Sequence, residues 1–262
     1  MYVKESGTQG APTIVFLHGM GTSSWMWEAQ TQDLSDFHCL NFDLPGHGKS
    51  NHIPWLSLDD TADQIAALIE TRATKQRAYV VGLSLGAYVT LHLLKRHAAR
   101  VERAVLSGVT TAPLPNKGLM SIQAQVISFM LKRAWFIRAQ AKMLRMPDDV
   151  IASYTESMMS MSRKTFLDIF NEVINFRLPK ELSQVNVPML VTAGSEEMKP
   201  VLDAVIEIAS TLPNAEARLA PGGHHGWNGE APELFSAMLR AWFTAMPLPA
   251  ELQQPELVRV KV

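Results

Sequence analysis

Short apolar runs alternate with longer segments of helical period along most of the chain. Each run is brief, rich in β-branched residues and bounded by glycine, proline or a polar residue. This alternation is typical of α/β proteins, in which helices cover both faces of a mostly parallel central sheet. The runs predict strands at 13–17, 37–42, 78–81, 103–107, 189–192 and 217–220.

Two segments carry the pattern of sheet-covering helices. Ser57, followed three residues later by Asp60, resembles a capping box at the start of the first helix. Pro232 suits the first turn of the second. Their apolar stripes comprise Leu58, Ala62, Ile65 and Ile69 in the first, and Leu234, Phe235, Met238, Leu239 and Trp242 in the second.

The alternation breaks between 113 and 187, where no run resembles a strand. Amphipathic helical stretches fill this region and are separated by Arg145-Met146-Pro147, by Ser162 and by Leu178-Pro179. The sequence therefore predicts a core domain in two parts, 1–112 and 188–246, with an all-helical insertion at 113–187. A tail follows at 247–262, where 258–262 alternates like a strand but is too short to assign.

The predicted insertion is rich in methionine and aromatic residues. Such side chains suit an adaptable apolar wall around a ligand, and they equally fill ordinary cores, so both interpretations stay open. For four arginines of the region, we favour side chains that face solvent over a role in binding a ligand carboxylate. The residues concerned are Met120, Met130, Met143, Met146, Met158, Met159, Met161, Trp135, Phe136, Phe166 and Phe170, with Arg133, Arg138, Arg145 and Arg177.

Charge and composition narrow the partners. The 24 basic and 25 acidic residues nearly cancel, and no long run of like charge occurs, which argues against nucleic acid and against an anionic membrane. We expect a small-molecule substrate; the sequence does not indicate the oligomeric state. The single Cys39 and the absence of a leader-like or long apolar run favour a soluble, cytoplasmic protein. No motif for a metal or a nucleotide cofactor is present, so we expect no cofactor.

The pattern Gly82-Leu83-Ser84-Leu85-Gly86 lies between the predicted strand 78–81 and residues of helical spacing. A strand that turns sharply into a helix holds its serine in a strained conformation at the sheet's carboxyl edge, and glycines on either side relieve the crowding. This context favours Ser84 as a nucleophile over an ordinary helix cap.

Two backbone amides are candidates for an oxyanion hole. The N–H of Leu85 begins the helix after Ser84 and points to where negative charge develops when a serine attacks a carbonyl. Glycines around the N–H of Met20, in His18-Gly19-Met20-Gly21, allow a close approach to the same oxygen. His18 is then a loop organiser; the alternative is a glycine-rich turn without a catalytic role.

A further loop, Asp43-Leu44-Pro45-Gly46-His47-Gly48-Lys49-Ser50, resembles the D-x-P-G-x-G-x-S motif of the α/β-hydrolase superfamily. With the serine elbow and the His18-Gly19 pair, the resemblance spans 13–243 and points to serine-nucleophile members with a helical cap. It implies an α/β-hydrolase fold in which 113–187 is the cap. For Asp43 and His47 the resemblance implies a structural role, in which the loop shapes and supports the site.

The resemblance places the general base after the last strand, in Pro221-Gly222-Gly223-His224-His225-Gly226-Trp227-Asn228. Relatives often end in G-x-G-H-x-W-N with a proline seven residues beyond the histidine. His225 fits that spacing, with Trp227-Asn228 and Pro232 after it, and is favoured over His224. Imidazole suits the role because it accepts and returns a proton near neutral pH.

The family's acid follows the penultimate strand, three residues after a glycine. Counted from Gly194, that position holds Glu197, and glutamate is an accepted variant of such triads. Because glutamate is one methylene longer than aspartate, a shift to Glu196 stays open, as does a solvated carboxylate at either position. The order Ser84, Glu197, His225 matches the family's order.

The resemblance implies a carboxylesterase-like serine hydrolase that cleaves an ester or related acyl bond of a mainly apolar small molecule. A second hypothesis keeps the same triad for hydrolysis of a carbon–carbon bond, for peracid formation or for lyase chemistry. A third is a ligand-binding member of the fold without hydrolytic activity. The glutamate in place of aspartate keeps the third hypothesis open.

Overall fold

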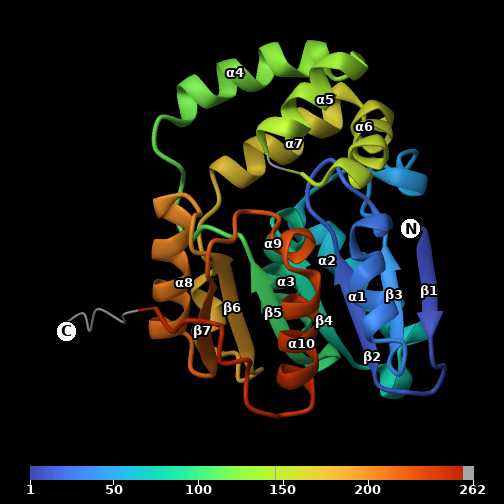
Figure 1. Cartoon of the computed structure of the whole chain (residues 1–262), viewed down its shortest axis with the longest axis vertical. Helices are drawn as coiled ribbons and strands as arrows, with labels where there is room; N and C mark the ends of the chain where they lie inside the picture. The colour runs from blue at the N-terminus through green and yellow to red at the C-terminus, as the bar shows by residue number, and fades with distance from the viewer. Residues whose placement is uncertain (145, 256–262) are drawn as a thin grey trace.

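A single sheet of seven strands organises the residues that the computed structural model describes, 1–144 and 146–255. The strand order is β1-β3-β2-β4-β5-β6-β7 (Figure 1). All neighbours pair in parallel except β1, which runs antiparallel to β3. The strands are β1 (Val3–Gly7), β2 (Thr13–Leu17), β3 (His38–Phe42), β4 (Ala78–Leu83), β5 (Val101–Ser107), β6 (Met189–Gly194) and β7 (Ala215–Ala220).

The sequence predicts six of these strands, and the structure corrects the prediction by adding β1. This strand lies at the edge of the sheet and is mostly polar, with Lys4, Glu5 and Ser6 at its centre. An edge strand is half solvated, so it lacks the apolar run that marks a buried strand. Only its pairing with β3 reveals it.

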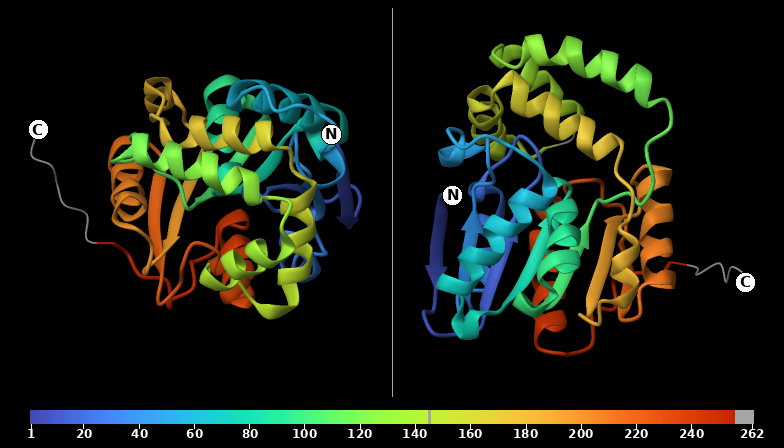
Figure 2. Two further views of the ribbon diagram at one scale, coloured as in Figure 1. Left: turned by 90° about the horizontal axis from the view of Figure 1, so that it is seen from above. Right: turned by 180° about the vertical axis from the view of Figure 1, so that it is seen from behind.

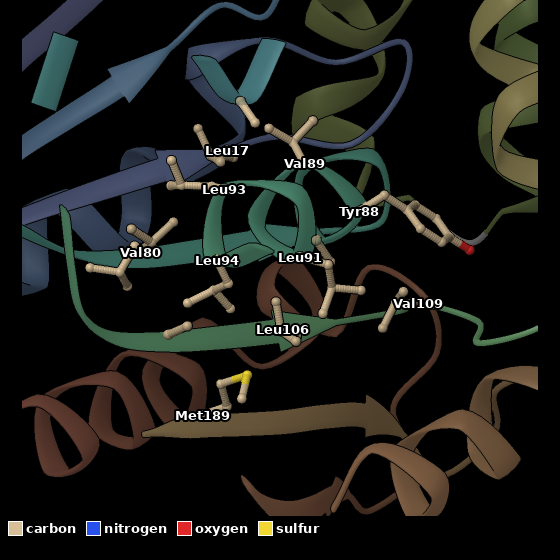
Figure 3. Close-up of a cluster of buried hydrophobic side chains, with 14 of the residues drawn as sticks. Leu17, Val80, Tyr88, Val89, Leu91, Leu93, Leu94, Leu106, Val109 and Met189 are labelled. Atoms are coloured by element: carbon tan, nitrogen blue, oxygen red, sulfur yellow. The ribbon is translucent and has the colours of Figure 1, made fainter. Parts of the chain in front are cut away.

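Alternate side chains of each central strand enter two different cores. In β2, Val15 and Leu17 join the cluster beneath α2, α3 and α8, while Ile14 and Phe16 join the one beneath α1 and α10. Figure 3 shows how Leu91 and Leu94 of α3 pack over Leu106 in the first cluster. These helices are α1 (Glu28–Asp33), α2 (Leu58–Arg72), α3 (Leu85–His97), α8 (Lys199–Thr211) and α10 (Pro232–Phe243).

Both predicted sheet-covering helices are present, with the predicted starts. The N–H of Asp60 donates to the Ser57 hydroxyl at 3.0 Å, so Ser57 caps α2. Pro232 occupies the first turn of α10. The remaining short elements are α9 (Trp227–Glu230) and the 3-10 helices η1 (Ser24–Trp27), η2 (Gly48–Ser50), η3 (Thr74–Gln76), η4 (Ala98–Arg100), η5 (Asp148–Val150) and η6 (Lys180–Gln184).

Between β5 and β6 the chain leaves the sheet and forms four α-helices beyond the carboxyl ends of the parallel strands (Figures 1 and 2). They are α4 (Lys117–Met130), α5 (Ala134–Met143), α6 (Ile151–Ser160) and α7 (Arg163–Ile174). The region is helical as the sequence predicts; the domain boundaries 113 and 187 themselves stay predictions.

The inserted helices have a small core of their own. Met158 and Met161 are buried in it, so for these two methionines the core-filling interpretation applies. Met143 and Trp135 instead face solvent, with 76% and 66% of their surface exposed. The buried members of this core are Ala124, Leu131, Ile137, Ala141, Tyr154, Met158, Met161 and Phe166.

Hydrogen bonds from two tryptophans tie the inserted helices to the sheet domain. The Trp25 indole donates to the Ser157 hydroxyl at 2.9 Å. On the other side, the Glu172 carboxylate of α7 accepts from the Trp55 indole at 3.0 Å and from the N–H of Leu58 at 2.9 Å. Leu58 begins α2, so the carboxylate also lies at the positive end of a helix dipole.

The predicted tail runs back along the outer edge of the sheet. Gln253 and Leu219 of β7 exchange two backbone hydrogen bonds, at 2.8 and 2.9 Å. Leu252 is buried in the cluster beneath α10. The alternating stretch 258–262 lies outside the described residues. In the described ranges, no helix is both long and apolar enough to cross a membrane.

We expect Glu172→Gln to lower the free energy of unfolding by about 1–3 kcal/mol, because a neutral amide replaces a charged acceptor shared by two donors. Urea unfolding followed by circular dichroism measures the change. Asp168→Asn is the matched control on the same helix. Among the described residues Asp168 pairs only with the exposed Lys164, so its substitution should cost less than about 0.5 kcal/mol. Equal losses for the two variants would contradict the role of Glu172.

Candidate active site

Ser84 stands at a sharp turn between β4 and α3. Its backbone has φ 53° and ψ −118°, a conformation that non-glycine residues adopt only where the surrounding structure imposes it. Side chains on the flanking glycines would prevent the turn. A Cβ on Gly82 would lie 2.3 Å from the Gly86 carbonyl oxygen, and one on Gly86 would lie 2.0 Å from that of Leu17. The sequence pattern thus has a steric cause.

The two amides proposed for the oxyanion lie close to this turn. Leu85 is the first residue of α3, and its N–H donates to no described residue. The N–H of Met20 is likewise unengaged within the described ranges. A Cβ on the neighbouring Gly19 would lie 3.6 Å from the Ser84 Cβ, so the loop that carries Met20 abuts the serine.

Two buried histidines, His18 and His47, lie beneath the loop that carries Met20. The Gly19 carbonyl accepts from His18 Nδ1 at 2.8 Å, and His18 Nε2 accepts from the N–H of Leu44 at 3.0 Å. Burial lowers the pKa of His18 to about 4 and that of His47, whose ring lies 4.9 Å from the His18 ring, to about 3. Both are therefore neutral at physiological pH, and His18 organises the loop.

Asp43 holds the loop 43–50 in place. Its carboxylate accepts from the N–H of Ser24 at 2.7 Å and from the N–H of Lys49 at 2.8 Å. Both carboxylate oxygens are thereby held by backbone donors, one from η1 and one from the loop 43–50, so Asp43 joins the two segments. This matches the supporting role that the sequence predicts for Asp43.

Glu197 lies in the turn that follows β6. A Cβ on Gly194, at the end of that strand, would lie 2.0 Å from the Gly223 carbonyl oxygen, so the loops after β6 and β7 are in close contact. The Glu197 side chain is 4% exposed, and its Oε1 lies 2.5 Å from His225 Nδ1. Glu196 is exposed and contacts the Ser195 hydroxyl instead.

The two adjacent histidines point to different carboxylates. His225 pairs with Glu197, and its side chain is 46% exposed. His224 turns towards Glu230 of α9, which accepts from its backbone N–H at 2.9 Å and lies 3.3 Å from its Nδ1. Of the open alternatives, the structure therefore brings together His225 and Glu197.

Trp227 and Asn228, which the sequence uses only to place the histidine, anchor the loop that carries His225. The buried Trp227 indole donates to the Ser107 hydroxyl at 3.1 Å, at the end of β5. The Asn228 carbonyl accepts from the Gln30 side chain at 2.9 Å. Both contacts hold the end of the loop against the sheet while His225 stays accessible.

Gly108 is a site residue that the sequence interpretation missed. It follows β5 with φ +70°, and a Cβ there would lie 2.8 Å from His225 Cε1 and 3.5 Å from Glu197 Oε1. The backbone carbonyl of its neighbour Ser107 accepts from the N–H of Ser84 at 2.7 Å. The end of β5 therefore has the serine on one side and the histidine–glutamate pair on the other. A glycine directly after a predicted strand was the available signal.

Within the described residues, the Ser84 hydroxyl and His225 form no hydrogen bond. Such bonds are often long before substrate binds and tighten in the complex. In the same residues, no group of three or more His, Cys, Asp and Glu side chains could hold a metal ion.

The model of the alpha/beta hydrolase family matches residues 14–238 of the chain. The chain belongs to this family. The match contains the serine elbow, the Met20 loop, Glu197 and His225. The protein is thus an alpha/beta hydrolase enzyme, and its activity is hydrolysis or related chemistry.

Several proteins resemble the chain over most of its length. An AB hydrolase superfamily protein from Gibberella zeae is 26% identical over 255 residues, which cover 94% of this chain and 84% of the relative. A bromoperoxidase from Bacillus anthracis superposes with a TM-score of 0.82 at 20% identity, covering 93% and 95% of the two chains. An enol-lactonase from Burkholderia xenovorans gives 0.76 at 22% identity, covering 93% and 96%. At these identities the two structures show the fold alone.

We expect stability to fall as the pH drops from about 6.5 to about 4. Unfolded imidazole binds a proton in this window, whereas His18 and His47 in the folded protein do not, so protonation favours the unfolded state by about 3 kcal/mol for each histidine. Urea unfolding at several pH values measures the slope. His47→Asn should make it shallower, and His52→Asn, at an exposed position, should leave it unchanged. An unaltered slope in His47→Asn would refute this explanation.

Proposed function

We propose that the protein is a serine hydrolase that cleaves an ester or related acyl bond of a small, mainly apolar substrate. Ser84 is the nucleophile, His225 the general base and Glu197 the acid that orients it. The proposal rests above all on the 2.5 Å contact between His225 Nδ1 and the buried Glu197, at the strand end that also receives the N–H of Ser84.

In the proposed mechanism, the contact with Glu197 makes Nε2 of His225 the base. A carboxylate only accepts hydrogen bonds, so Nδ1 carries the proton and Nε2 keeps its lone pair. Nε2 then takes the hydroxyl proton as Ser84 Oγ bonds to the substrate carbonyl carbon, and it returns that proton to the leaving alcohol. The Glu197 carboxylate stabilises the imidazolium between these two steps.

The unengaged amides of Met20 and Leu85 supply the oxyanion hole of the proposed mechanism. As Ser84 attacks, the carbonyl oxygen gains negative charge, and two preoriented N–H donors stabilise it without reorganisation. The amino end of α3 adds the positive pole of a helix dipole at the same point. Water then hydrolyses the acyl-enzyme by the same proton transfers in reverse order.

The fold alone does not select the bond that is cleaved. The unengaged amides of Met20 and Leu85 beside Ser84 suit attack on an acyl carbonyl, which supports ester chemistry. The proposed location is the cytoplasm, which the single cysteine supports because it leaves no partner for an internal disulfide.

Ser84→Ala should lower hydrolysis of a short-chain p-nitrophenyl ester by at least about 10³-fold and abolish labelling by a fluorophosphonate, because only an activated serine reacts with that probe. Ser210→Ala, at an exposed position on α8, is the control and should label like the wild type. Labelling that persists in Ser84→Ala would exclude Ser84 as the nucleophile. A wild type that neither labels nor turns over would favour ligand binding instead.

Paired substitutions test the partners of Ser84. His225→Ala and Glu197→Gln should each lower kcat by about 10³-fold or more, because the base or its orienting carboxylate is lost. The neighbours His224→Ala and Glu196→Gln should change kcat by less than about tenfold, since neither side chain reaches the pair. The reverse ranking within either pair would reject the assignment. Comparing esters with a vinylogous diketone in the same assay separates acyl from carbon–carbon hydrolysis.

A further inference from the structure

The outer face of α4 carries a continuous apolar stripe. At 100° per residue, the four exposed side chains of this stripe fall within about 80° of one another around the helix. Ala124 and Ser128, on the opposite side, are buried in the core of the inserted helices. The stripe consists of Leu119, Ile122, Val126 and Phe129, which are 59–67% exposed.

The next helix, α5, places a tryptophan among cations. Trp135, Arg138 and Lys142 recur at helical spacing on the exposed face, opposite the buried Ile137 and Ala141. Trp135 is the one exposed tryptophan of six in the chain. An indole flanked by basic residues on a short amphipathic helix is typical of helices that lie in a lipid interface.

The charge of this region is one-sided. No aspartate or glutamate occurs between Arg103 and Pro147; acids return at Asp148 and Asp149. Arg133, Arg138 and Lys142 are exposed, and among the described residues none of them forms an ion pair. The Arg163 guanidinium lies 3.7 Å from the centre of the Phe129 ring, which adds a cation beside the stripe.

We propose that the α4–α5 face, defined by Leu119, Ile122, Val126, Phe129, Trp135, Arg138 and Lys142, docks onto an anionic lipid surface. Apolar side chains enter the interface while basic residues contact the anionic headgroups, each contributing about a factor of five in affinity. The near-neutral charge of the whole chain argued against a membrane partner. That total hides the local excess of basic residues on α4 and α5.

A second copy of the chain fits this face less well. A two-fold dimer brings the same patch of each subunit together, so the basic residues of one copy would face those of the other. The segment offers no acid to compensate them. Like charges facing each other across an interface are unfavourable, whereas an anionic lipid surface is complementary.

If Ser84 is the nucleophile of the proposed function, the position of α4 and α5 places lipid docking on the side of the molecule that carries the reaction. Both helices lie beyond the carboxyl ends of the strands, the end of the sheet at which Ser84 stands (Figures 1 and 2). Docking through them would therefore place the lipid on the same side of the molecule as the serine.

Co-sedimentation with vesicles tests the electrostatic part. The protein should bind vesicles of phosphatidylcholine with phosphatidylglycerol, should bind pure phosphatidylcholine weakly, and should dissociate as salt is raised. The double variant Arg138→Gln with Lys142→Gln should bind roughly thirtyfold more weakly. Lys75→Gln with Arg77→Gln is the matched control before β4, at the opposite end of the sheet, and should bind like the wild type.

The apolar part is tested separately. Ile122→Gln with Val126→Gln should lose vesicle binding, while Leu56→Gln with Met246→Gln, equally exposed but outside the face, should retain it. Brominated lipids should quench part of the tryptophan fluorescence of the wild type. In Trp135→Phe this quenching should be lost. Circular dichroism verifies that each variant is folded.

Absence of binding to anionic vesicles, or equal binding to neutral ones, would overturn the docking proposal. So would a dimer in light scattering that Ile122→Gln with Val126→Gln dissociates, because the stripe would then be a contact between copies. None of these measurements depends on turnover, so a failure of docking is distinguishable from a failure of the serine hydrolase mechanism.

Discussion

Close approach of backbone at the carboxyl edge of the sheet is the constraint on which the site depends. The turn at Ser84 forms because Gly82 and Gly86 leave room for the Gly86 and Leu17 carbonyl groups. At the neighbouring strand end, Gly108 leaves room for His225 and Glu197. Missing side chains thus let the ends of β4 and β5 meet the histidine–glutamate pair, close to the Met20 and Leu85 amides that we propose as oxyanion donors.

Polar contacts join the inserted helices to the sheet domain. Glu172 links α7 to the start of α2, and Ser157 of α6 receives the Trp25 indole close to the Met20 loop. Tyr154 and Met158 of α6 also pack against Gly21 in that loop. Movement of α6 would therefore disturb the loop that carries Met20, the oxyanion donor that we propose. The lipid contact is proposed for two other helices of the insertion, α4 and α5.

Much of the fold could be predicted because the buried strands are continuous apolar runs and helices α2 and α10 carry both a stripe and a start signal. The polar edge strand β1 could not, since it gains its identity from pairing with β3. The candidate site was predicted as alternatives. Adjacent residues such as His224 and His225 have the same sequence context, and only the direction of each side chain separates them.

The sequence by itself determined the α/β class, the serine elbow, the helical region between β5 and β6, and the order of the candidate triad. These features depend on local periodicity, on glycine spacing and on motif order, all of which are legible along the chain. The tertiary structure alone decided that Glu197 meets His225, that Gly108 accommodates them, and that the apolar stripe of α4 is left exposed. Those outcomes depend on contacts between residues far apart in sequence, which no local pattern encodes.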